Sequence, residues 1–168
     1  ILHVYQSIDL GTETKADQSP VTAADLAAHH VLKNGLSNVT PQIPVVSEED
    51  AKSLTIPQNH TRYWLIDPLD GTKEFIQRNG EFTCNLALID NHLPMYGFVT
   101  VPAVGLLYHG GNNQGAHRQD RDGVGTVIRC KKQKKTIRVI ASKSHLNTET
   151  AEFIDNIRAP VELIQAGS

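Results

Sequence analysis

The sequence of 168 residues is poor in cysteine, methionine and tryptophan, and it has little net charge and no long apolar run. Two cysteines, Cys84 and Cys130, are too few for a disulfide framework and suit a reducing compartment, so we expect a cytoplasmic protein. The lack of a run of about 18 apolar residues predicts no transmembrane segment. A net charge of −2 provides no long-range attraction for a phosphate backbone, which argues against a nucleic-acid polymer as partner.

The single methionine, Met95, lies deep in the chain, so Ile1 is not a translation start and we expect further sequence upstream. The first ten residues carry no basic start, which predicts no signal peptide. The length is enough for one hydrophobic core, or for one core and part of another.

Hydrophobic periodicity predicts a long helix followed by a region rich in strands. Apolar residues recur at helical spacing over 21–36, with Pro20 just before them. Shorter helices are predicted at 72–77 and 148–157. Strand-like runs lie at 43–47, 63–67, 82–89, 95–101, 106–109, 137–141 and 161–164, with weaker ones around Ala116 and Val127. Turn residues such as Asp90-Asn91-His92 separate the middle runs, so the pattern predicts an antiparallel meander in an α+β fold.

The most informative stretch is Trp64-Leu65-Ile66-Asp67-Pro68-Leu69-Asp70-Gly71-Thr72, where an apolar strand ends in one aspartate and a second follows three residues later. In a fully extended strand these carboxylates would lie about 10 Å apart on opposite faces, whereas two metal ions that share a phosphate lie about 4 Å apart. If both carboxylates serve one site, we expect the chain to turn after Asp67. Pro68 and Gly71 suit such a turn.

The amides of Gly71 and Thr72 would then open the next helix and favour an anion such as phosphate. A plain structural interpretation of the two aspartates, as a turn and a helix cap, stays open. A calcium EF-hand loop fails because its twelfth position is Arg78 instead of glutamate. The haloacid dehalogenase signature fails because its nucleophilic aspartate would fall on Pro68.

Two further acidic groups lie elsewhere in the chain, at Ser47-Glu48-Glu49-Asp50 and at Thr22-Ala23-Ala24-Asp25. The first could be a solvated loop, and the second resembles a capping box with Asp in place of Glu. Asp25, however, lies at the edge of the apolar stripe, where an unpaired carboxylate would be costly. Oxygen ligands of this kind suit Mg²⁺ better than zinc, and the eight histidines show no zinc-binding spacing.

The stretch from Trp64 to Thr72, together with Ser47-Glu48-Glu49, resembles the inositol monophosphatase superfamily of Mg²⁺-dependent, lithium-sensitive phosphatases. Residues 15–25 and 71–83 are similar to its bisphosphate nucleotidase branch. The resemblance implies a layered sandwich of helices and antiparallel sheet. It also implies hydrolysis of 3'-phosphoadenosine 5'-phosphate to AMP and phosphate, in sulfate assimilation and nucleotide recycling. An inositol or sugar monophosphatase is the alternative among enzymes.

The resemblance further implies roles for individual residues. Glu48 and Asp67 would hold one Mg²⁺ with the Leu69 carbonyl, Asp67 and Asp70 would hold a second, and two or three ions are expected in all. Asp25, Glu48 and Thr72 would orient the attacking water. The substrate would contact Glu48, Asp70, Gly71, Thr72, Ser142 and His145.

Members of the superfamily continue through a second α/β domain with one more metal-binding Asp beside a Trp, and the only tryptophan here is Trp64. We therefore expect residues 1–135 to form an α+β metal-binding domain and residues 136–168 to begin a C-terminal α/β domain that is mostly absent. Without that further ligand, the second ion should bind weakly. A catalytically impaired metal- or nucleotide-binding fragment is thus the alternative to an active enzyme. A homodimer and peripheral association with the cytoplasmic face of an inner membrane are left open.

Overall fold

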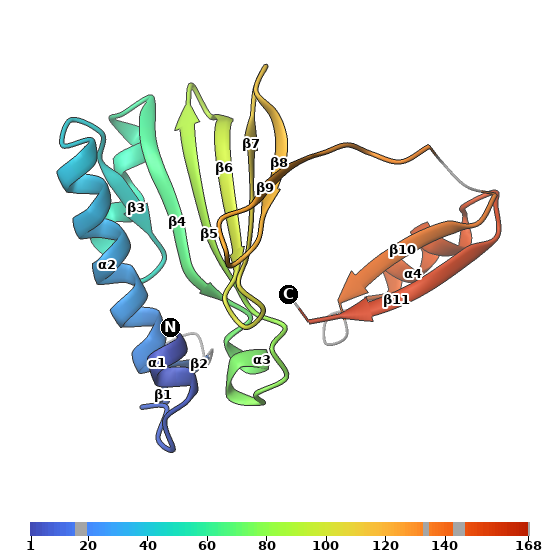
Figure 1. Cartoon of the computed structure of the whole chain (residues 1–168), viewed down its shortest axis with the longest axis horizontal. Helices are drawn as coiled ribbons and strands as arrows, with labels where there is room; N and C mark the ends of the chain where they lie inside the picture. Colours follow the sequence, from blue (N-terminus) through green and yellow to red (C-terminus); the bar gives the residue numbers. More distant parts are fainter. Residues whose placement is uncertain (16–19, 133–134, 143–146, 168) are drawn as a thin grey trace. The chain divides into compact units, whose positions relative to one another are not determined.

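The computed structural model describes residues 1–15, 20–132, 135–142 and 147–167, which fall into two compact units, Ile1–Ile128 and Arg129–Ser168. The first unit is built on a seven-stranded sheet in the order β3-β4-β5-β6-β7-β8-β9 (Figure 1). Together with its helices, this mixed sheet confirms the predicted α+β class. The domain boundary expected between residues 135 and 136 stays a prediction.

Five consecutive strands form the predicted meander, each antiparallel to the next. They are β5 (Thr83–Asp90), β6 (Leu93–Val101), β7 (Leu106–Gly111), β8 (Gly115–Gln119) and β9 (Gly125–Ile128). The turn between β5 and β6 is at Asn91 and His92, both of which have positive φ. Two such residues in sequence give a tight turn whose twist matches that of the strands, so the β5–β6 register is set locally.

A different connection joins β3 (Val45–Ser47) to β4 (Arg62–Asp70). These two strands are parallel, with Val45 opposite Trp64 and Ser47 opposite Ile66. Parallel neighbours need a crossover, and here the chain crosses through the 3₁₀ helix η1 (Ala51–Gln58). Both strands therefore end at the same edge of the sheet.

The long helix α2 (Ala23–Val39) lies beside β3 and β4 (Figure 1). Before it come α1 (Leu2–Tyr5), β1 (Glu13–Thr14) and β2 (Pro20–Val21), and the short helix α3 (Thr72–Ile76) follows β4. Leu10, Ala24, Leu69, Phe75 and Phe82 form a buried cluster at this end of the unit. Burying Phe75 and Phe82 completely contributes about 1.5–3 kcal/mol each, so the core anchors α3 and the end of β4.

The second unit contains β10 (Ile137–Ser142) and β11 (Val161–Ala166), which are parallel and connected by α4 (Thr148–Asp155). Asn147 caps α4, because its Oδ1 accepts a hydrogen bond from the Thr150 amide at 2.9 Å. In neither unit do the described residues form a helix long and apolar enough to cross a membrane.

Candidate metal centre and active site

Parallel pairing of β3 and β4 brings two acidic residues to one edge of the sheet. Ser47 lies opposite Ile66, and each is followed by a carboxylate, Glu48 after β3 and Asp67 within β4. Residues that follow a matched pair of parallel strands stay neighbours. The register thus explains why two motifs nineteen positions apart in sequence share one site.

Asp67 and Asp70 are brought to one face by a β-bulge in β4. Asp67 is opposite Asn85 and Asp70 is opposite Thr83, so three steps along β4 match two steps along β5. Asn85 and Thr83 face the same side because side chains alternate along a strand. The one extra residue in β4 therefore turns the side chain of Asp70 to the face of Asp67.

After Asp67, β4 continues to Asp70 with the register shift of a bulge between the two residues. Proline is tolerated at a bulge, because Pro68 has no N–H that would need an acceptor on the neighbouring strand. The chain turns at Gly71, whose φ of 88° is left-handed and suits glycine. The β-bulge, which the sequence did not predict, brings the two aspartates to one face before that turn.

Asp67 is the most perturbed acid of this site. Its Oδ1 is buried, and no hydrogen-bond partner for it lies among the described residues. Burial, followed by the charges of Glu48 and Asp70, raises the pKa of Asp67 from 3.8 to about 7. The amide oxygen Oδ1 of Asn85, directly across the ladder, is also buried without a described partner. Two neighbouring oxygens that lack donors fit a bound cation, because buried oxygens are otherwise hydrogen-bonded.

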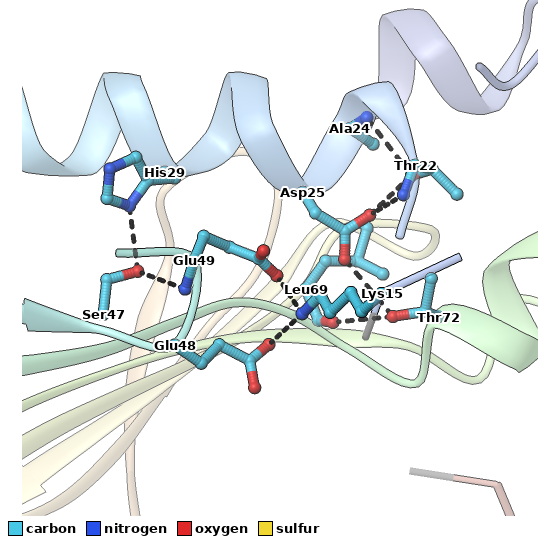
Figure 2. Close-up of polar contacts among 10 residues, drawn as sticks. All are labelled: Lys15, Thr22, Ala24, Asp25, His29, Ser47, Glu48, Glu49, Leu69 and Thr72. Atoms are coloured by element: carbon cyan, nitrogen blue, oxygen red, sulfur yellow. Dashed lines mark hydrogen bonds and ion pairs between the residues drawn. The ribbon is translucent and has the colours of Figure 1, made fainter. Parts of the chain in front are cut away.

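Asp25 joins the start of α2 to Thr72. It is 1% exposed, and its Oδ2 accepts hydrogen bonds from the Thr22 amide at 2.7 Å and the Thr22 hydroxyl at 2.6 Å. Its Oδ1 accepts from the Thr72 hydroxyl at 3.3 Å, and the Leu69 carbonyl oxygen lies 3.4 Å from the same hydroxyl (Figure 2). The capping box expected from the sequence is present. Asp25 is thus both a helix cap and part of the site.

Lys15 is a site residue that the sequence reasoning missed. Its Nζ lies 2.7 Å from Glu49 Oε1 and 3.9 Å from Glu48 Oε1 (Figure 2). Partial burial raises the pKa of Glu48, although the Lys15 ammonium opposes that shift. The only available signal was that Lys15 opens the segment 15–25, which the family resemblance already included.

The structure brings together Asp25, Leu69 and Thr72 by direct contacts, and Glu48, Asp67 and Asp70 by register and charge. As placed, no group of three or more His, Cys, Asp or Glu residues in the described part of the chain could hold a metal ion. Ser142 is the last residue of β10, in the second unit. His145 lies outside the described residues. The roles assigned to these residues stay predictions.

The comparisons with known proteins agree on one family. The sequence pattern of the inositol monophosphatase family matches residues 1–163. The 3'(2'),5'-bisphosphate nucleotidase CysQ of Escherichia coli is 44% identical over 158 residues, which cover 94% of this chain and 63% of that protein. The chain therefore spans less than two thirds of the length of this curated relative.

Solved structures share the fold. The crystal structure of CysQ from Bacteroides thetaiotaomicron superposes with a TM-score of 0.80 at 35% identity, covering 99% of this chain and 67% of that one. An IMPase/NADP phosphatase complexed with Mg²⁺ and phosphate superposes with a TM-score of 0.70 at 22% identity, over 92% of this chain and 58% of that one. The second likeness extends the agreement in fold alone.

Proposed function

Since this chain belongs to the inositol monophosphatase family, we propose that the protein is a Mg²⁺-dependent phosphatase that converts 3'-phosphoadenosine 5'-phosphate to AMP and phosphate. The observation that carries the proposal is Asp67, whose buried Oδ1 has no donor among the described residues and whose carboxylate lies near the charges of Glu48 and Asp70. The names of the curated relatives support the nucleotide substrate. A role in sulfate assimilation and nucleotide recycling is part of the same proposal.

The residues present fit Mg²⁺. Glu48, Asp67 and Asp70 offer carboxylate oxygens, and Leu69 offers a carbonyl, which is the hard oxygen set that this ion prefers. Two or three ions are proposed for the complete site. When bound, Mg²⁺ would lower the pKa of a coordinated water and neutralise charge on the phosphoryl oxygens.

Thr72 would orient the water that attacks phosphorus. Its hydroxyl donates to Asp25 or to the Leu69 carbonyl, so its oxygen is left to accept a hydrogen bond from water. Asp25 is itself held by two hydrogen bonds from Thr22, which keeps its carboxylate in place as an acceptor for the Thr72 hydroxyl. A water that donates to Thr72 would present a lone pair to the phosphoryl group. Glu48 would serve the same water from the other side.

The substrate phosphate would lie at the turn between β4 and α3. Gly71 lacks a side chain and has positive φ, so its backbone and the Thr72 amide can approach an anion closely. Ser142 and His145 would contact the adenosine. The cytoplasmic location, the homodimer and the membrane association stay predictions.

The test is phosphate release by the full-length gene product in Mg²⁺ and in EDTA. We expect Mg²⁺-dependent release from 3'-phosphoadenosine 5'-phosphate, inhibition by lithium, and a lower rate on inositol 1-phosphate. Asp67→Asn should abolish release, whereas Asp90→Asn, which alters a surface carboxylate paired with Arg62, should not. Equal or faster release from inositol 1-phosphate would contradict the substrate, and release that persists in EDTA would contradict the metal.

A further inference from the structure

A buried histidine of α2 is connected to the acidic loop through a serine. His29 is 6% exposed, and its Nδ1 lies 2.9 Å from the hydroxyl of Ser47, a residue that is completely buried at the end of β3 (Figure 2). The Ser47 hydroxyl also accepts a hydrogen bond from the Glu49 amide at 3.3 Å. Ser47 directly precedes Glu48, so this contact reaches the backbone that carries the proposed metal ligand.

The loop is closed from its other side by Ser53. The Ser53 hydroxyl accepts from the Ser47 amide at 2.9 Å and lies 2.6 Å from the Asp50 carbonyl oxygen. Both ends of the acidic segment are therefore held by hydroxyl groups. Among the described residues, the Ser47 hydroxyl bonds to α2 through His29, and the Ser53 hydroxyl does not.

The donors and acceptors fit one arrangement. The Ser47 oxygen accepts from Glu49, so its proton can be donated to His29 Nδ1, provided that this nitrogen carries no proton. In this arrangement the Glu49 amide donates to the Ser47 oxygen, and the Ser47 hydroxyl donates to His29 Nδ1. Each of these three groups then has a hydrogen-bond partner. Burial, with the charge of Lys33, lowers the pKa of His29, which agrees with a neutral ring. His29 acts here as an acceptor and not as a cation.

We propose that His29 is a positioning residue of the metal site, which orients the Ser47 hydroxyl and through it fixes the backbone that aims Glu48 at Asp67. The inference rests on the proposed function, because it needs Glu48 to be a metal ligand. It adds a residue of α2 that would touch neither substrate nor metal. Partners that hold a ligand indirectly in this way change metal affinity by about 10- to 100-fold when removed.

The test is Mg²⁺ affinity, measured by calorimetry on the 168-residue chain and as the Mg²⁺ dependence of phosphate release by the full-length protein. His29→Leu removes the acceptor and nearly keeps the volume, so we expect Mg²⁺ to bind about tenfold more weakly. His29→Asn places an amide oxygen near the position of Nδ1 and should restore most of that affinity. An exposed histidine of the same unit gives the control, and His60→Leu should bind Mg²⁺ like the wild type.

A double-mutant cycle separates positioning from general destabilisation. Ser47→Ala should weaken Mg²⁺ binding as His29→Leu does, and the double variant should be no weaker than Ser47→Ala alone, because both remove one path. Additive losses, wild-type affinity in His29→Leu, or no rescue by His29→Asn would overturn the inference. A purely structural role would shift the unfolding midpoint in EDTA and leave the affinity of the folded protein unchanged. If Asp67→Asn leaves Mg²⁺ binding intact, the proposed metal site itself fails and the inference fails with it.

Discussion

Asp67 shows how a proposed ligand can weaken the fold that carries it. In the metal-free protein its pKa is raised from 3.8 to about 7, first by burial and then by Glu48 and Asp70. The folded chain therefore binds a proton that the unfolded chain has lost between these two values. Stability from this group is fully present below about pH 4 and is lost as the pH rises through about 7.

We expect the free energy of unfolding in EDTA to fall between pH 4.5 and 8, with Asp67 contributing on the order of 1–2 kcal/mol, because water near this partly exposed carboxyl weakens the effect. Asp67→Asn should flatten that part of the profile and stabilise the metal-free protein at pH 8. Urea titrations at several pH values measure both. An unchanged slope in Asp67→Asn, or a flattened one in Asp90→Asn, would contradict the assignment.

Lys15 should stabilise the acidic loop when metal is absent. Glu49, its partner at 2.7 Å, has a side chain only 5% exposed, so Lys15→Met leaves a buried carboxylate without its cation. We expect a loss of about 1–3 kcal/mol in EDTA, partly recovered in Mg²⁺. Thermal unfolding with and without Mg²⁺ provides the comparison. Lys33→Met breaks the more exposed pair with Asp50 and should cost at most about 1 kcal/mol.

At the scale of elements, the sequence pattern predicted the long helix α2 better than it predicted the strand β4, which carries Asp67 and Asp70. Thr22 and Asp25 predicted the start of α2. The helix runs past Gly35 to Val39, where the Thr40 hydroxyl and amide donate to the Leu36 carbonyl. The residues of β4 did not predict the bulge. A bulge is a mismatch between two strands, so it depends on how β4 meets β5, which no pattern within β4 contains.

Substitutions of two glycines, one at the turn that ends β4 and one within α2, test the role of backbone conformation. Gly71 has φ of 88°, so Gly71→Ala should destabilise the chain by about 1 kcal/mol or more. Gly35 lies within α2 with open space at its missing Cβ, so Gly35→Ala should stabilise by about 0.5–1 kcal/mol. Chemical denaturation in EDTA measures the change in the free energy of unfolding for both variants. Equal effects at the two positions would show that backbone conformation does not govern Gly71.

At the scale of the whole molecule, the sequence identified most residues of the candidate site but not their contacts. Asp25, Glu48, Asp67 and Thr72 stand out because they lie in the motifs that resemble the inositol monophosphatase family. Lys15 reaches Glu49 only through tertiary folding, and His29 reaches Ser47 in the same way. Contacts of this kind depend on how segments far apart in the sequence pack together, and local pattern carries no such information.

The division of the chain into two units predicts a separation of metal binding from nucleotide preference. The three carboxylates proposed as ligands all lie in Ile1–Ile128, whereas Ser142 and His145 lie in Arg129–Ser168. We expect a protein of residues 1–128 to keep the Mg²⁺ affinity of the 168-residue chain and to lose any binding of 3'-phosphoadenosine 5'-phosphate beyond that of inorganic phosphate. Calorimetry on both proteins, after circular dichroism confirms folding, decides the matter. Undiminished nucleotide affinity in residues 1–128 would remove Ser142 and His145 from the site.

The parallel pairing of β3 with β4 also bears on the order of events during folding. The hairpins of the meander close over short turns, but β3 and β4 must wait for the chain between them to close through η1. Glu48 and Asp67 should therefore meet after the rate-limiting step. Mg²⁺ would then slow unfolding in stopped-flow experiments and leave the refolding rate unchanged, since it stabilises contacts absent from the transition state. The ion would therefore prolong the lifetime of the folded sheet without speeding its formation.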